Sequence, residues 1–130
     1  MGLNYLWDTN TAIYFLQRQF PPTAEQFIDG LLVNNRPVIS AITEIELLSW
    51  KTENEKDLNV VSNFIQDSFV IELEQPIKLK TADIRKTLGI KLPDAIIAAT
   101  ASVYNLTLIT RNVRDFNRVT EIKTINPFEV

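Results

Sequence analysis

Short apolar segments alternate with longer helix-like segments along the chain, and this alternation restricts the possible folds more than any other feature. The apolar segments resemble buried β-strands and lie at residues 3–7, 36–40, 69–73, 106–110 and 121–125. Apolar periodicity and helix-capping residues predict helices at 11–18, 21–35, 41–52, 55–68, 75–88, 92–105 and 112–119, the last capped by Asn112. Strands separated by one or two helices typically form parallel sheets. We therefore expect a three-layer α/β/α fold with a mostly parallel sheet of four or five strands.

The composition is that of a soluble globular protein and excludes several kinds of active site. Hydrophobic residues make up 45% of the chain and charged residues 22%, and no repeat or linker divides residues 1–130, so we expect a single domain. No apolar run approaches the ~20 residues that span a bilayer, and no signal peptide is recognisable. These absences favour a cytoplasmic protein without membrane contact. Cysteine and histidine are both missing, which excludes disulfides, thiolate sites and a histidine base.

The charge is unevenly distributed. The net charge is -3, but residues 1–77 contain four basic and eleven acidic residues, whereas residues 78–130 contain nine basic and five acidic ones. A basic C-terminal part can contact phosphates even in an acidic protein, so a nucleic-acid substrate is not excluded. An uneven solvated surface is the simpler alternative, and both stay open at this point.

Polar side chains follow three of the predicted strands, at the edge where open α/β sheets bind ligands. Asp8 follows the first strand, and Asp94 lies in the first turn of the helix that leads into the fourth. The other polar residues at these ends are Ser40, Thr43, Thr110, Asn112 and Asp115. Because the carboxyl ends of parallel strands share one edge, we expect these side chains to converge there.

Each acidic residue of this set also has a purely structural explanation. Asp8 would cap the helix that follows it, and Asp94 would interact favourably with its helix dipole. Asp115, three residues after Asn112, would complete a helix cap. The sequence alone leaves these alternatives open beside the functional ones.

Two further carboxylates lie on the helix predicted at 41–52. Glu46 has Ile42 and Trp50 one turn to either side, which predicts a covered face on which a carboxylate is costly unless a cation pairs with it. Glu44 has Ser40 and Leu48 at the same spacing and is expected at the surface.

Carboxylates brought together without histidine or cysteine repel one another, and a bound cation is the simplest way to stabilise them. Oxygen ligands from Asp and Glu suit Mg²⁺ or Mn²⁺. Such an ion supports hydrolysis of a phosphodiester by an activated water, with no nucleophile from the protein.

At this point the residues resemble a known family, the PIN-domain ribonucleases, and within it the VapC-type toxins of bacterial toxin/antitoxin modules. The matching stretches are "DTN" at 8–10, "SAITEIEL" at 40–47, "LPDAIIAATA" at 92–101, "TRNVRDF" at 110–116 and "INPF" at 125–128. They occur in the family's order and span nearly the whole chain. Two positions depart from the pattern: Glu44 stands where an apolar residue is commoner, and Trp50 where a glycine is frequent.

The resemblance implies a Mg²⁺- or Mn²⁺-dependent endoribonuclease. The family's pattern S-x-x-T-x-x-E selects Glu46 over Glu44, so the implied catalytic and metal-binding residues are Asp8, Glu46, Asp94 and Asp115. The implied supporting residues are Asn10, Ser40, Thr43, Thr110 and Asn112. Asn10 and Thr9 would orient Asp8 or a water molecule.

The resemblance also implies partners. VapC-type toxins usually form homodimers and are silenced by a small cognate antitoxin, for which helices 11–18 and 23–34 would supply the docking surface. The substrate would be RNA, and the basic residues expected near the pocket to hold its flanking phosphates are Arg111, Arg114 and Arg118.

Two other classes of function remain. A non-catalytic metal-binding or interaction module of the same fold would carry the same residues. A phosphohydrolase with Asp8 as covalent nucleophile would need a DxDxT loop, but Asn10 stands where that chemistry requires an acid.

Overall fold

Within residues 3–130 the protein has five parallel strands, and three of them carry candidate site residues at their carboxyl ends. A computed structural model describes residues 3–130. The strands are β1 (Tyr5–Trp7), β2 (Val38–Ser40), β3 (Phe69–Ile71), β4 (Thr107–Ile109) and β5 (Lys123–Ile125). Two hydrogen-bonded sheets result, one in the order β1-β4-β5 and the other pairing β2 with β3. The predicted parallel arrangement is confirmed, and β2 lies beside β1 without continuing its ladder.

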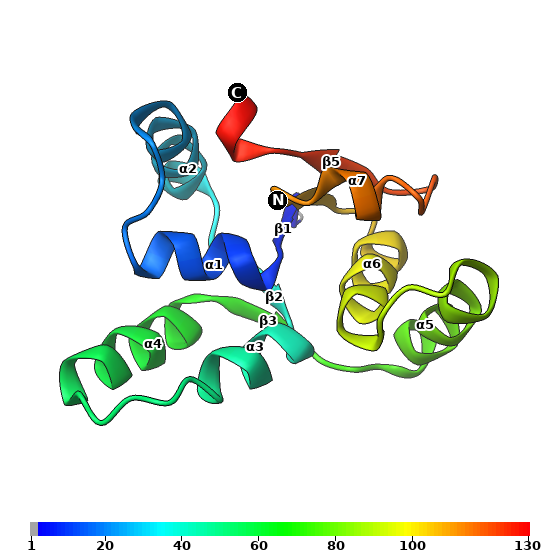
Figure 1. Ribbon diagram of the computed structural model, residues 1–130, viewed down its shortest axis with the longest axis horizontal. Helices are drawn as coiled ribbons and strands as arrows, with labels where there is room; N and C mark the ends of the chain where they lie inside the picture. Colours follow the sequence, from blue (N-terminus) through cyan, green and yellow to red (C-terminus); the bar gives the residue numbers. More distant parts are fainter. Residues whose placement is uncertain (1–2) are drawn as a thin grey trace.

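Helices connect the strands and flank them on both sides. They are α1 (Thr9–Leu16), α2 (Pro22–Asn34), α3 (Ala41–Leu48), α4 (Glu55–Asp67), α5 (Gln75–Leu88), α6 (Leu92–Tyr104) and α7 (Val113–Phe116), followed by the 3₁₀ helix η1 (Pro127–Glu129). Figure 1 shows α5 and α6 together on one side of the strands, with α1, α3 and α4 on the other. The expected three layers are therefore present.

Alternate strand residues build two hydrophobic cores. Leu6 and Leu108 point into a core shared with α5, α6 and α7. Their neighbours Trp7 and Ile109 point the other way, into a core shared with α1, α2 and α4. This is the two-residue alternation of a strand, and burial on both faces explains why the strands read as continuous apolar runs.

Helix α6 approaches the strands closely because its buried face is built from small side chains. Alanine occupies most of its fully buried positions, namely Ala95, Ala98, Ala99 and Ala101. With Pro93 in its first turn, the helix begins at Leu92 and ends at Tyr104, followed by the C-cap Asn105 in the left-handed conformation. The packing of this helix therefore sets the position of Asp94.

Several predicted boundaries differ from the structure. The helix predicted at 41–52 ends at Leu48, because the Ser49 hydroxyl and backbone N–H both donate to the Ile45 carbonyl and close the last turn. The strands are shorter than predicted because their outer residues lie outside the paired ladder. Asn112 occupies the N-cap position of α7, but its side chain does not cap the backbone as predicted.

None of the helices within residues 3–130 combines the length and the apolar character needed to cross a membrane.

Candidate active site

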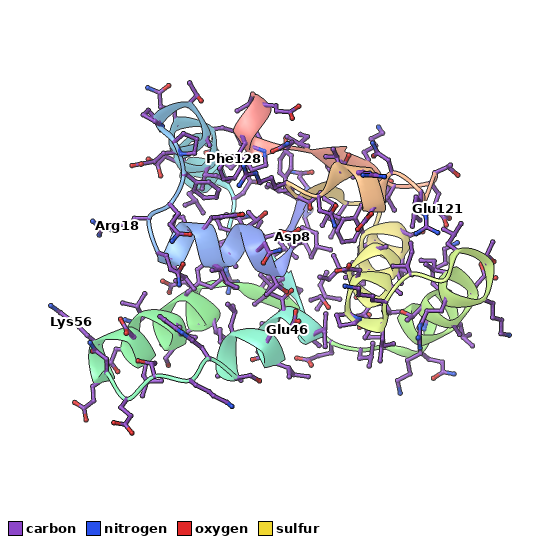
Figure 2. All side chains as sticks on the ribbon, viewed as in Figure 1. Asp8, Arg18, Glu46, Lys56, Glu121 and Phe128 are labelled. Atoms are coloured by element: carbon purple, nitrogen blue, oxygen red, sulfur yellow. The ribbon has the colours of Figure 1, made fainter. Side chains whose placement is uncertain are left out.

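Three carboxylates from different elements line one cavity of about 240 Å³ at the carboxyl ends of the strands. Asp8 follows β1, Glu46 comes from α3, and Asp94 lies in the first turn of α6. Thr9 and Asn10 complete the polar lining. Asp8 and Glu46 lie near the centre of the molecule, as Figure 2 shows. The cavity has room for several water molecules, each of which occupies ~30 Å³ in the liquid.

The Asp8 carboxylate is buried, with 5% of the residue exposed, and both of its oxygens accept hydrogen bonds. Oδ1 accepts from the backbone N–H of Thr11 at 2.8 Å, which makes Asp8 the N-cap of α1. Oδ2 accepts from the Thr110 hydroxyl at 2.6 Å. Burial raises the pKa of Asp8 above its ordinary value, while the bonds from Thr11 and Thr110 oppose that rise. The capping role is therefore real, and it leaves one lone pair on each oxygen for a ligand.

Asp94 is half-buried and lies within electrostatic range of the other acids. Burial is the largest cause that raises its pKa, followed by the negative charge of Asp8. The charges of Asp115 and Glu46 raise it further, whereas Lys91, just before α6, lowers it.

The prediction that Glu46 lies on a covered face is wrong, because this residue is exposed while Glu44 is half-buried. The buried positions of α3 are Thr43 and Leu47, so the helix is rotated relative to the orientation that Ile42 and Trp50 suggested. Glu46 nevertheless lines the cavity, and its Oε1 accepts a hydrogen bond from the Thr9 hydroxyl at 2.6 Å.

Hydroxyl groups connect the carboxylates to the scaffold. The Thr9 Oγ1 that bonds Glu46 also lies 2.9 Å from Oγ1 of Thr43, a fully buried residue. Ser40 caps α3 by accepting from the N–H of Ile42 at 3.2 Å. The Thr9 hydroxyl therefore pairs with Glu46 and Thr43 and not with the Asp8 carboxylate. The spacing of these residues along the sequence did not indicate this pairing.

Hydrogen bonds link the polar residues that follow β4, namely Thr110, Asn112 and Asp115. Thr110 accepts from the backbone N–H of Asn112 at 2.9 Å in addition to its bond with Asp8. The Asn112 amide donates to Oδ2 of Asp115 at 3.0 Å instead of capping α7. Asp115 is exposed and is not among the described residues that line the cavity, although its charge reaches Asp94.

The three arginines predicted to lie near the pocket, Arg111, Arg114 and Arg118, have different surroundings. Arg111 lines a second cavity of about 270 Å³ with Asp8, Asn10, Tyr14 and Asn112. Arg118 donates to the carbonyl of Leu88 at the end of α5, and Arg114 is exposed on α7. The sequence did not single out Tyr14 as a site residue, although Tyr14 lies four residues after Asn10 and thus on the same face of α1.

An apolar groove adjoins the carboxylate cavity at Glu46. It lies between α1, α3 and α4 and is lined by Ile13, Leu16, Gln17, Glu46, Leu47, Ser49, Trp50 and Val61. The sequence predicted a docking surface formed by the helices that correspond to α1 and α2. Helix α1 does line this groove, but the other helices that line it are α3 and α4.

The donor set around the carboxylate cavity fits a hard divalent cation. The ligands on offer are carboxylate oxygens. Burial raises the pKa values of Asp8 and Asp94, and so do nearby negative charges, that of Glu46 on Asp8 and that of Asp8 on Asp94, which a cation would relieve. Asp8 is already oriented by two hydrogen bonds, as metal-binding carboxylates commonly are. Within the described part of the chain no three acidic side chains surround one point, but one or two carboxylates with water molecules are enough to hold Mg²⁺.

Comparison with known proteins identifies a family and several relatives. The PIN domain family matches residues 5–122. The tRNA(fMet)-specific endonuclease VapC of Salmonella typhimurium is 31% identical to the chain, covering 93% of it and 96% of the relative. Ribonuclease VapC1 of Haemophilus influenzae is 32% identical, covering 92% and 94%.

Solved structures of VapBC complexes have folds similar to that of this chain. DNA-bound VapBC from Salmonella typhimurium superimposes with a TM-score of 0.83 at 27% identity, covering 96% of this chain and 98% of that one. VapBC-1 from nontypeable Haemophilus influenzae superimposes with a TM-score of 0.79 at 28% identity, with the same coverage of both chains.

Proposed function

Because the chain belongs to the PIN domain family, we propose that it is a metal-dependent endoribonuclease and the toxin of a type II toxin/antitoxin pair, with residues 1–130 acting as a single nuclease domain. The observation that carries the proposal is the convergence of Asp8, Glu46 and Asp94 from three separate elements on one cavity. The relatives named as an endonuclease and a ribonuclease align over nearly their full length, which supports a nuclease activity.

We assign the metal-binding roles to four acidic residues, Asp8, Glu46, Asp94 and Asp115. Mg²⁺ or Mn²⁺ bound there would supply an activated water and neutralise charge on the phosphodiester. Asp8 is the fixed member of the set, because Thr11 and Thr110 orient both of its oxygens. Asp115 is the outermost member and is held by Asn112.

The remaining polar residues act on these carboxylates or on water. The Thr9 hydroxyl, on α1, holds Glu46 and lies in turn within hydrogen-bond distance of the Thr43 hydroxyl, while Ser40 caps the start of α3. Asn10 lines both cavities beside Asp8 and is placed to bind water or substrate. The hydrogen bonds on both Asp8 oxygens favour a role as ligand over one as covalent nucleophile.

Glu46 and Glu44 provide a matched test of this assignment. Glu46→Gln is expected to weaken metal binding and to lower the cleavage rate by about a hundredfold or more, because a charged ligand is lost while the Thr9 hydroxyl still finds an acceptor. Glu44→Gln removes the same charge from the same helix and should leave both properties nearly unchanged. Cleavage rates and titrations with Mn²⁺ measure the two effects, and equal activity of the two variants would refute the role of Glu46.

We further propose that a cognate antitoxin and a second copy of the chain are partners. The solved relatives are VapBC complexes, which supports the antitoxin, and homodimer formation is carried over from the family resemblance. The apolar groove between α1, α3 and α4 is the docking surface that we assign to the antitoxin, because it leads directly to Glu46. A partner bound there would control access to the carboxylate cavity.

Expression in bacteria tests the toxin role. Expression of the chain alone is expected to arrest growth, because free nuclease degrades cellular RNA. Co-expression with the adjacent short reading frame should restore growth, and its product should copurify with the chain. Asp94→Asn expressed alone is the control and should be harmless. Normal growth with a folded and active wild-type enzyme would contradict the toxin role.

A further inference from the structure

Arg111 is held in a defined orientation by two aromatic rings at the rim of the candidate active site. Its guanidinium carbon lies 4.2 Å from the centroid of the Phe128 ring and 5.9 Å from that of Tyr14. Its Nη1 donates to the Tyr14 hydroxyl at 3.3 Å. Stacking of a guanidinium on aromatic faces restricts its plane without using its N–H donors.

The C-terminal segment builds this support. Helix η1 packs beside α2, and Asn126 caps it by accepting from the Phe128 N–H at 2.9 Å (Figure 1). The Phe128 ring contacts Tyr14 on α1 and Phe20, with centroids 5.1 and 5.7 Å apart. Phe128, labelled in Figure 2, is thus fixed by the core on one side and faces Arg111 on the other.

The cavity lined by Arg111 adjoins the carboxylate cavity. Asp8 and Asn10 line both of them. An extended chain of phosphates that placed one group against the carboxylates would therefore run past Asn10 toward Arg111.

Arg111 retains the capacity to bind an anion at this place. Among the described residues, only the Tyr14 hydroxyl accepts a hydrogen bond from its guanidinium, and the one ion pair is that between Lys80 and Glu121. A guanidinium carries five N–H donors, so most of them remain for a ligand. A planar fork of donors matches the oxygens of a phosphate.

We propose that Arg111 binds a phosphate of the RNA strand next to the one that is cleaved, and that Phe128 and Tyr14 are positioning residues that hold Arg111 for this contact. This inference rests on the proposed nuclease function and deepens it. It distinguishes Arg111 from Arg114 and Arg118, which are not among the described residues that line either cavity.

Binding of a fluorescent single-stranded RNA oligonucleotide, measured by anisotropy in the presence of Mg²⁺, tests the role of Arg111. The variants are made in an Asp94→Asn background so that the RNA stays intact. Arg111→Gln should raise the Kd about tenfold. It should also lower the slope of log Kd against log salt concentration by about 0.7, the value for one phosphate contact on a single strand. Lys56→Gln, which removes one positive charge far away on α4 (Figure 2), is the matched control and should change neither value.

A double-mutant cycle tests the positioning role of Phe128. Phe128→Leu should raise the Kd severalfold in the presence of Arg111 and have no effect on binding in the Arg111→Gln variant, because the ring acts through the guanidinium. Phe128→Trp keeps an aromatic face and should restore binding. Additive losses from Phe128→Leu and Arg111→Gln would show a merely structural role for the ring and overturn this part of the proposal.

The two proposals fail in different ways. RNA binding that depends on Arg111, without cleavage by the wild-type chain, would refute the nuclease function and support the phosphate contact. Cleavage by the wild type together with an Arg111→Gln variant of unchanged Kd and salt slope would overturn the contact and leave the nuclease function standing. Failure of the Asp94→Asn protein to bind RNA at low salt would also overturn the contact.

Discussion

Asp94→Asn is expected to lower the rate of RNA cleavage by on the order of a thousandfold or more while the chain remains folded. The amide preserves the shape of the side chain in the first turn of α6, but it removes a negative charge from the cavity lined by Asp8 and Glu46. A neutral amide is a poor ligand for a hard cation, so the proposed metal site would be weakened. Rates on a labelled RNA, measured beside the far-ultraviolet circular dichroism spectrum, check both halves of the expectation.

The same variant should be more stable than the wild type when no metal is bound. Burial and the charge of Asp8 raise the pKa of Asp94, so the folded state binds more protons than the unfolded state between pH 3.8 and that raised pKa. Wild-type stability therefore falls as the pH rises through this window, and the gain from Asp94→Asn is complete above it and absent below it. Melting temperatures in EDTA measured across this pH range reveal the trend.

Asp83→Asn, a matched change at an exposed position on α5, is the control for both measurements. It should leave cleavage and the pH dependence of melting unchanged. An Asp94→Asn variant that cleaves at the wild-type rate would contradict the assigned site. A variant that melts lower than the wild type at neutral pH in EDTA would contradict the electrostatic account.

Chelation of divalent cations with EDTA should reduce cleavage to the level of the Asp94→Asn variant, and added Mg²⁺ or Mn²⁺ should restore it. The reason is charge: a cavity lined by Asp8, Glu46 and Asp94 repels a phosphodiester, which is itself an anion. The chain also lacks histidine, so no imidazole acid and base are present to activate the ribose hydroxyl.

The ends of the products separate this chemistry from that of metal-free ribonucleases. Attack by water needs no 2′-hydroxyl, so the products should carry 5′-phosphate and 3′-hydroxyl ends. End-labelling of the fragments, with and without prior phosphatase treatment, identifies them. Cleavage that survives EDTA, or fragments that end in 2′,3′-cyclic phosphate, would refute the metal mechanism.

The alternation of segments predicted the fold because strands β1, β2 and β4 are buried on both faces. Leu6 and Trp7 enter opposite cores, so both must be apolar and the strand appears as a continuous run. Helix ends were predictable where one residue decides them, as at Gly89, which adopts a positive φ of 65° after α5. The end of α3 at Leu48 was not, because a local bond from Ser49 outweighs the apolar periodicity that continues beyond it.

The sequence located only those site residues that follow a strand or belong to one of the matching motifs. The position of Asp8 and Asp94 at one edge follows from parallel topology, since Asp8 follows β1 and Asp94 lies at the start of α6, the helix that leads into β4. The exposure of Glu46 was mispredicted because α3 is apolar on most of its surface, and periodicity then carries little information on orientation. The contact between Arg111 and Phe128 depends on how the C-terminal segment folds back on α1, and no short-range pattern encodes it.

The alanine face of α6 has a consequence for how this chain can diverge in evolution. Ala95, Ala98 and Ala99 are fully buried, and an enlarged side chain at such a position costs about 1–3 kcal/mol of stability. Selection for a folded protein therefore preserves the small residues around Asp94 whether or not the carboxylate is used. A descendant that had lost its activity would keep the alanines for as long as it kept its fold. The spacing of the small residues therefore indicates common ancestry, whereas only the acidic residues indicate that the activity has been retained.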